Sequence, residues 1–169
     1  FPILILILLG VFTKSAQFPF HFWLPQAMAA PTPVSAYLHS ATMVKAGVFM
    51  LARLYPVLGG TYDFEIIVSV VGLTTMAFAA YVAIFKHDIK GLLAYSTISH
   101  LGLIIFLIGL SSPLSAAAAV FHIINHATFK ASLFMVAGII DHECGTRDMC
   151  RLRGLFKFMP YTATLAMVA

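Results

Sequence analysis

The sequence predicts an all-α fold, a polytopic transmembrane helix bundle. Of its 169 residues, 61% are hydrophobic and only 9% are charged, and the mean hydropathy is +0.97. A water-soluble domain of this size needs roughly a quarter of its residues charged, so the composition excludes a water-soluble enzyme. Because a helix needs about 20 residues to cross a bilayer, the length allows about five or six crossings. We expect one transmembrane domain over residues 1–169.

Five apolar stretches, separated by proline, glycine and charged residues, are the expected membrane segments. They cover residues 2–13, 34–55, 66–85, 92–110 and 114–140. The last four are long enough to span a bilayer. The sequence opens on Phe1 and closes at Ala169 inside a fresh apolar run. We therefore expect it to be a fragment of a longer protein.

The first segment is expected to be broken, because prolines follow it at positions 19, 25, 31 and 33. Proline removes a helical hydrogen bond and restricts the residue before it, so no continuous helix joins Lys14 to Val34. We expect a helix that breaks beside Lys14, followed by a re-entrant or interfacial piece. Irregular backbone at membrane depth is tolerated only where protein or a water-filled cavity surrounds it. The break is therefore a candidate site.

The distribution of Lys and Arg predicts the orientation. Arg53 alone lies near one set of loops, whereas the opposite loops hold the residues Lys86, Lys90, Arg147, Arg151, Arg153 and Lys157. Cytoplasmic loops carry the excess of basic residues, so loops 86–90 and 141–157 are expected to be cytoplasmic in a multi-pass protein of the cell membrane. The net charge of +4 then describes loop bias, and no nucleic-acid partner is expected. No disulfide is expected between Cys144 and Cys150 in a reducing compartment.

Three lysines, Lys14, Lys45 and Lys130, lie where a charge is costly. A lysine at the bilayer centre costs about 2.5 to 3.5 kcal/mol even on a lenient insertion scale. Lys45 is near the middle of its segment, too deep for its ammonium to reach interfacial water. It must face protein, water or a counter-charge. Two interpretations remain open: a structural bond between helices, or a proton carrier, since a desolvated lysine can exchange its proton near neutral pH.

A row of ionisable residues follows on the last long segment. His122, His126 and Lys130 are spaced by four, which places them on one helical face. Successive members are about 6 Å apart along the axis, too far for a direct hydrogen bond of about 3 Å, so water must link them. Asn125 and Thr128 would add polar groups to that hydrated interior. A single membrane histidine is also explained by hydrogen bonding between helices.

The remaining candidates are less specific. His39 is six residues from Lys45, so the two are expected on different faces of one helix. His100 and Thr97 lie near the centre of the fourth segment and are possible members of the site. Lys90, at the start of that segment, is also explained by the charge bias of cytoplasmic loops.

Other classes of protein are less consistent with these residues. The run His142, Glu143, Cys144 with Cys150 lacks the spacing of a structural zinc site, and no metal or other cofactor is expected. A haem protein needs axial ligands on facing helices, which the histidines permit, but haem leaves the membrane lysines unexplained. A purely structural membrane protein would have no use for the row at His122, His126 and Lys130.

Two long stretches resemble a known family. They are Lys-Ser-Ala-Gln-Phe-Pro-Phe-His-Phe-Trp-Leu-Pro-Gln-Ala-Met from Lys14 and Ala-Pro-Thr-Pro-Val-Ser-Ala-Tyr-Leu-His-Ser-Ala-Thr-Met-Val-Lys-Ala-Gly from Ala30. Both are similar to the antiporter-like membrane subunits shared by respiratory complex I, membrane-bound hydrogenases and Mrp-type cation/proton antiporters, and the stretches from Asp88 and His126 agree. The Met-Val-Lys-Ala-Gly sequence around Lys45 and the loop at 140–148 resemble the large A subunit of Mrp-type Na+/H+ antiporters.

The resemblance implies a fold of fourteen or more helices with two broken ones, of which this chain would hold about the seventh to the eleventh. By position, Lys14 matches a lysine that pairs with a glutamate, and His39 matches a gating or coupling histidine. The central hydrophilic axis would comprise His122, His126 and Lys130, with Lys90 near its cytoplasmic end. His100 departs from the family pattern, which commonly shows Gln there. The glutamate and a later lysine of the axis lie outside these residues.

The function implied by the resemblance is proton translocation through a mid-membrane axis of Lys, His and water, within a Na+/H+ antiporter complex. The chain would be part of a secondary transporter, not an enzyme, and would need no cofactor. Its partners would be the other subunits of a hetero-oligomeric complex, the lipid bilayer, H+ and Na+. The alternative is a proton-pumping membrane subunit of respiratory complex I, the NADH-quinone oxidoreductase, or of a membrane-bound hydrogenase.

Overall fold

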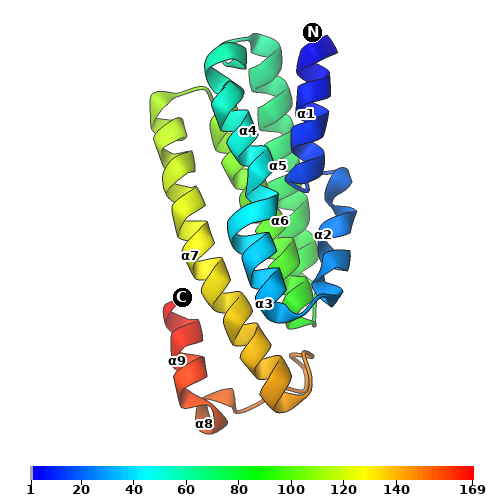
Figure 1. Ribbon diagram of the computed structural model, residues 1–169, viewed down its shortest axis with the longest axis vertical. Coiled ribbons are helices and arrows are strands. Elements are labelled where there is room, and N and C mark those ends of the chain that lie inside the picture. Colours follow the sequence, from blue (N-terminus) through cyan, green and yellow to red (C-terminus); the bar gives the residue numbers. More distant parts are fainter. Residues whose placement is uncertain (1) are drawn as a thin grey trace.

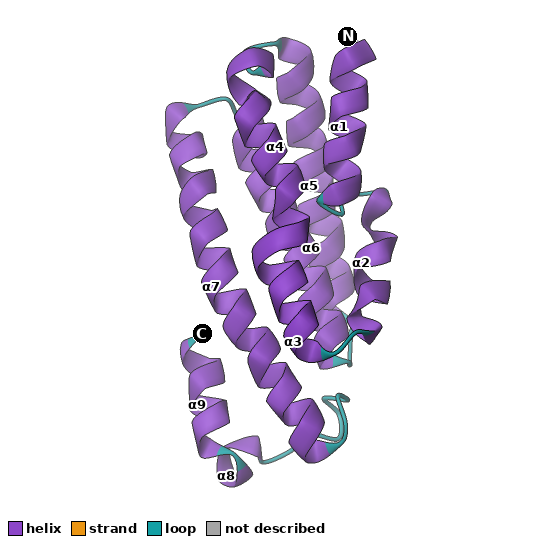
Figure 2. Cartoon of the chain, viewed as in Figure 1, coloured by secondary structure: helices purple, strands orange, loops and turns teal. Residues whose placement is uncertain are grey.

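The computed structural model describes residues 2–169, without the side chains of Ser40 and Ala41, and Phe1 lies outside the described residues. Its long elements are helices that run roughly along one axis, and Figures 1 and 2 show no strand among the described residues. Within the described residues, four helical segments are long and apolar enough to cross a membrane: Thr32–Leu58, Tyr62–Ile84, Ile89–Gly109 and Pro113–Cys144. The four full-length spans expected from the sequence are therefore confirmed.

The first helix, α1 (Pro2–Lys14), ends where the sequence predicts a break. The chain leaves the helix through Ala16, whose φ of 51° lies in the left-handed region. The indole Nε1 of Trp23 donates to the carbonyl oxygen of Thr13 at 3.0 Å, which satisfies a group that the end of a helix leaves unpaired. Three short turns follow, η1 (Phe20–Phe22), α2 (Trp23–Gln26) and η2 (Ala27–Ala29). None of them could span a bilayer.

The second membrane segment is built from three consecutive helical pieces. They are α3 (Thr32–Ser35), the π-helical η3 (Ala36–Thr42) and α4 (Met43–Leu58). A π-helical turn is wider than an α-turn and is frequent at functional sites. His39 lies inside η3, so the helix is irregular at one of the expected site residues.

α5 (Tyr62–Ile84) and α6 (Ile89–Gly109) form the most extensive helix pair of the bundle. Two glycines allow this close approach. A Cβ on Gly72 would lie 2.5 Å from the backbone nitrogen of Phe106, and a Cβ on Gly102 would lie 2.7 Å from that of Met76. Lipid provides little hydrophobic force between helices, so small residues that let backbones pack closely become the main source of association.

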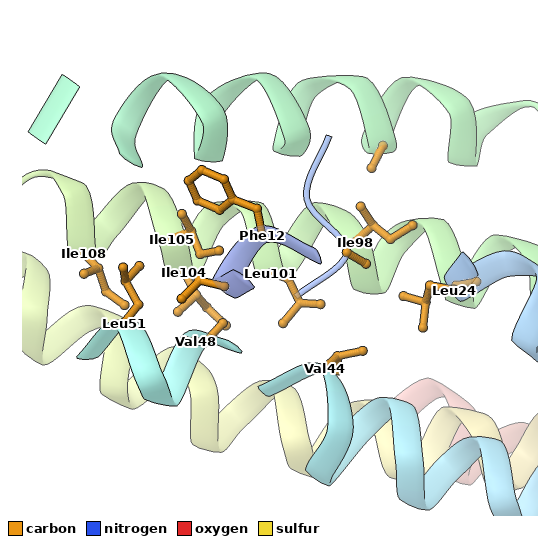
Figure 3. Close-up of a cluster of buried hydrophobic side chains, with 14 of the residues drawn as sticks. Phe12, Leu24, Val44, Val48, Leu51, Ile98, Leu101, Ile104, Ile105 and Ile108 are labelled. Atoms are coloured by element: carbon orange, nitrogen blue, oxygen red, sulfur yellow. The ribbon is translucent and has the colours of Figure 1, made fainter. Parts of the chain in front are cut away.

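α6 is the central helix, since it packs against α2, α4, α5 and α7. Figure 3 shows the apolar side chains Ile98, Leu101 and Ile104 of α6 in one cluster with Phe12 of α1 and Val48 of α4. These residues are buried. One side of α6 therefore belongs to an apolar core.

α7 (Pro113–Cys144) is the longest helix, with 32 residues. A capping box between Ser112 and Ser115 begins it, and Gly145 in the left-handed conformation ends it. It extends beyond the predicted limits of 114–140, since the polar residues from Asp141 to Cys144 are helical as well. The chain then passes through α8 (Leu155–Phe158) to α9 (Pro160–Val168), which packs against α7.

The two basic connections meet at one end of the bundle. The amide of Ile89 donates to the carbonyl oxygen of Arg147 at 3.1 Å, and the amide of Met149 donates to that of His87 at 2.9 Å. An isolated antiparallel bridge joins Asp88 to Asp148. The loops at 86–90 and 141–157, predicted to lie on the same side, are thus in contact.

Candidate functional site

Three histidines meet between α6 and α7. The Nδ1 of His100 on α6 lies 3.1 Å from the Nε2 of His122 on α7, so one ring donates a proton to the other. The ring of His126 lies with its centroid 5.3 Å from that of His100 and 6.3 Å from that of His122. The row predicted on α7 therefore has a direct partner on α6, which the spacing along one helix does not predict.

His126 is the most enclosed member of the cluster. Its side chain is 0% exposed, and neither ring nitrogen has a hydrogen-bond partner in the described part of the protein. The ring of Phe129 packs edge-on against it, with centroids 5.5 Å apart. An unpaired buried polar group costs about 1 to 3 kcal/mol. Such a group is a natural partner for an interior water molecule.

Lys130 lies one turn further along α7 and is also buried, at 2% exposure. Its ammonium donates to the carbonyl oxygen of Leu93 at 3.4 Å and to the hydroxyl of Ser96. The same Leu93 oxygen accepts from the hydroxyls of Ser96 at 3.0 Å and Thr97 at 2.7 Å. The charge of Lys130 is thus stabilised by neutral oxygens of α6, and among the described residues it has no carboxylate partner.

Lys45 reaches the cluster from α4. Its Nζ donates to the carbonyl oxygen of Ile123 at 3.0 Å, one residue after His122. The side chain is buried. Lys45 therefore faces protein, and along α7 His126 lies between Ile123, whose oxygen accepts from Lys45, and Lys130.

His39 is buried within the π-helical turn η3 of the same membrane segment. An aromatic neighbour is Trp23, with ring centroids 6.3 Å apart, and the Nδ1 of His39 has no partner among the described residues. Lys14, at the end of α1, is exposed. No hydrogen bond or ion pair of Lys14 occurs within residues 2–169 as the structure describes them. These two residues do not join the histidine cluster.

Lys90 is an interior group, not a loop charge. It is 3% exposed, donates to the carbonyl oxygen of Ala30 at 3.4 Å, and has its Nζ 3.7 Å from the Oδ2 of Asp141. Lys90 also lies three residues before Leu93, on the same side of α6. It therefore continues the line of polar groups that Lys130 begins.

A cavity of about 520 Å³ opens beside the cluster. Its lining includes His122, Asn125, Thr128 and Ser132 of α7. The hydroxyls of Thr128 and Ser132 donate to carbonyl oxygens four residues earlier, at 3.1 Å each. Their oxygens remain free to accept, so the cavity has a polar wall at the middle of the helix.

Three features of the site do not follow from sequence reasoning. The contact of His100 with His122 depends on how α6 and α7 are rotated, which the sequence pattern does not reveal. Asp141 is expected in a loop, whereas it lies on α7 and pairs with Lys90. No sequence pattern singles out His21, yet it is buried among Phe18, Phe22 and Phe78.

Cys144, the last residue of α7, and Cys150, in the connection that follows, are both free and exposed. The Sγ of Cys150 lies 3.7 Å from the Nδ1 of His87. Within the described part of the chain, no group of three or more His, Cys, Asp or Glu side chains is arranged to hold a metal ion.

Comparison with known proteins places this arrangement in a family. The family model described as "NADH:quinone oxidoreductase/Mrp antiporter, TM" matches residues 1–169. The probable A/B subunit of a K(+)/H(+) antiporter from Rhizobium meliloti (strain 1021) is 74% identical over 167 residues, which are 99% of this chain and 17% of that protein. The A subunit of the Na(+)/H(+) antiporter from Bacillus subtilis (strain 168) is 54% identical over 178 residues, covering 99% of this chain and 22% of the relative.

Two solved structures share the fold. A chain of the Mrp complex from Dietzia sp. DQ12-45-1b superposes with a TM-score of 0.92 at 49% identity, over 96% of this chain and 18% of that chain. A chain of the membrane-bound sulfane sulfur reductase, an archaeal respiratory membrane complex, superposes with a TM-score of 0.89 at 31% identity, over 98% of this chain and 34% of that one.

The match extends over the whole of this chain but only part of its relatives. The chain spans 17% and 22% of the length of the two curated relatives. With four helical segments of membrane length, it is a multi-pass membrane protein. It belongs to the NADH:quinone oxidoreductase/Mrp antiporter transmembrane family and resembles the A subunits of the antiporter branch.

Proposed function

We propose that this chain forms the middle section of a proton path in the A subunit of a monovalent cation/proton antiporter. The observation that carries the proposal is the direct contact of His100 with His122, 3.1 Å apart, beside the buried ammonium of Lys130. Ionisable residues inside a membrane are costly and are as a rule functional. Here they come from two facing helices and gather at one place.

The path follows a line of polar groups through the bundle. It begins at Lys90, continues to Lys130 at the Leu93 oxygen, passes the three histidines, and ends near Lys45 at the Ile123 carbonyl. A neutral imidazole accepts a proton at one nitrogen and releases one from the other. Where neighbours are too far apart for direct transfer, as at His122 and His126, bridging water completes the step.

The lysine at the break would couple this path to charge elsewhere in the full-length protein. Lys14 ends α1 next to irregular backbone, and by resemblance to the family it alternates between a glutamate partner and the axis. His39, buried in the π-helical turn, would control access from another face of the same segment. Proton movement along the path would then be coupled to cation movement in the opposite direction.

The transported cation is sodium or potassium. One relative is named as part of a K(+)/H(+) antiporter and another as part of a Na(+)/H(+) antiporter. Both belong to transporters, so we assign this chain to a transporter and not to an enzyme. It would act within a hetero-oligomeric complex in the cell membrane, as a single transmembrane domain, with loops 86–90 and 141–157 in the cytoplasm.

Lys130→Ala in the full complex tests the proposed function. The variant should abolish Na+/H+ and K+/H+ exchange, measured with a pH-sensitive dye in inverted membrane vesicles, while the subunits still co-purify. Lys157→Ala is the matched control, because Lys157 is an exposed lysine outside the bundle interior. Exchange that persists in Lys130→Ala would show that the path is assigned wrongly.

A redox-driven proton pump is the second candidate. The observation in its favour is the superposition on a chain of an archaeal respiratory membrane complex, with a TM-score of 0.89. The same line of lysines and histidines would serve both functions. A pump would move protons when NADH or another reductant is oxidised, without a sodium or potassium gradient, and its gene would lie beside genes for quinone-reductase subunits.

A further inference from the structure

A cleft opens at the end of the bundle where the two basic connections meet. It has a volume of about 690 Å³ and lies between residues 29–33 and the last turns of α7. Lys90 and Asp141 both contribute to its wall. The proposed proton path, which begins at Lys90, thus opens on a cavity large enough to hold water molecules.

Lys90 and Asp141 differ in their access to water. Their side chains are 4% and 34% exposed, and Nζ lies 3.7 Å from Oδ2. The ammonium is held inward by the Ala30 carbonyl oxygen at 3.4 Å. Asp141 is therefore the member of the pair that is open to the water of the cleft, and Lys90 is the member that faces the interior.

Asp141 has a second basic neighbour. The Nε of Arg147 lies 3.8 Å from its Oδ1 and 3.6 Å from an oxygen of Asp88. Arg147 thus keeps the Asp141 carboxylate in place whether or not Lys90 carries a charge. The other titratable residues of the cleft, His142 and Glu143, are exposed and pair with each other at 3.0 Å, so they do not compete for Asp141.

We propose that Asp141 is a proton-loading residue for the path, and this proposal rests on the function proposed above. When Lys90 is a neutral amine, the carboxylate of Asp141 takes a proton from hydronium in the cleft and forms an O–H bond. That bond then breaks as an N–H bond forms on Lys90, directly or through one bridging water. The carboxylate is restored, and Lys90 becomes an ammonium.

The loaded proton would pass from Lys90 toward Lys130. Lys90 and Leu93 are three residues apart on one face of α6, and the Leu93 oxygen already accepts from Lys130. The carboxylate is needed most when free protons are scarce. Removing it should therefore slow exchange more at alkaline pH than at neutral pH.

Asp141→Asn in the full complex is the test. We expect exchange to fall about tenfold or more at alkaline pH, as for the loss of a general acid–base group, with a smaller loss at neutral pH. Asp141→Glu should restore much of the rate, since it keeps a carboxylate in the cleft. Asp88→Asn is the matched control, because it removes the other partner of Arg147 while asparagine still caps α6 at the Gly91 amide.

The outcomes separate this inference from the proposed function. If Asp141→Asn exchanges at the wild-type rate across the pH range while Lys130→Ala is inactive, Asp141 does not load the path but the path itself stands. If Asp141→Asn and Asp88→Asn lose assembly or activity equally, the acidic residues hold the loop and the loading role is wrong. If Lys130→Ala remains active, the proposed function fails whatever Asp141 does.

Discussion

The Nδ1 atom of His100 lies 3.1 Å from the Nε2 atom of His122 across the interface of α6 and α7. This contact joins two membrane helices through groups that can both donate and accept a proton. The ring of His100 is also the neighbour, on the opposite helix, of His126, the most enclosed histidine of the cluster.

Two replacements of His100 should show whether exchange depends on its hydrogen bond to His122 or only on the space that its side chain fills. His100→Leu fills the space but has no polar atom, so proton exchange should fall about tenfold or more. His100→Gln can still donate to or accept from His122 and should keep most of the activity. The measurement is cation-driven proton exchange in vesicles, normalised to the amount of assembled complex, and equal rates in the two variants would contradict this role.

Lys45→Met should abolish exchange without loss of stability. Methionine is unbranched and one atom shorter than lysine, and a buried charge is replaced by apolar atoms at little or no cost in stability. The Ile123 carbonyl keeps its main-chain donor within α7. Thermal unfolding of the purified complex should be unchanged or raised, and exchange should be lost. A variant that unfolds at lower temperature and still transports would show that Lys45 only stabilises the packing of α4 against α7 through its hydrogen bond.

Gly102→Ala should weaken the pair of α5 and α6. The added Cβ would lie 2.7 Å from the Met76 nitrogen and 2.8 Å from the Gly72 oxygen, so the backbones must move apart at a cost of about 1 to 3 kcal/mol. Gly10→Ala is the control, since a Cβ there meets nothing within 4 Å. Melting temperature and yield in detergent report the effect. Equal values for the two variants would show that the close approach is not needed.

The native cysteines can report the orientation of the chain. Cys144 and Cys150 are exposed and free, and they lie in the connection predicted to be cytoplasmic. A membrane-impermeant maleimide should label them in inverted vesicles and not in intact cells. Thr61→Cys, in a variant with both native cysteines changed to serine, should show the reverse pattern because residue 61 lies in the loop at the opposite end. Labelling of Cys150 in intact cells would show that the chain has the opposite orientation in the membrane.

The sequence alone was sufficient for the membrane segments but not for the contacts between them. Apolar length and proline positions determine where α5 runs and where α1 breaks, because these depend on local chain and solvent properties. The row of His122, His126 and Lys130 follows from helical spacing. The partners His100 and Asp141 do not, since interhelical rotation and the extension of α7 bring them into place.

The oxygen of Leu93 has a consequence for how easily Lys130 can move. It accepts from the hydroxyls of Ser96 and Thr97 as well as from the lysine. When the ammonium swings away, the oxygen keeps both hydroxyl donors, and no buried acceptor is stranded. The departure of the lysine therefore leaves α6 with no unpaired oxygen at this point, and its cost falls on the ammonium, which must find new acceptors.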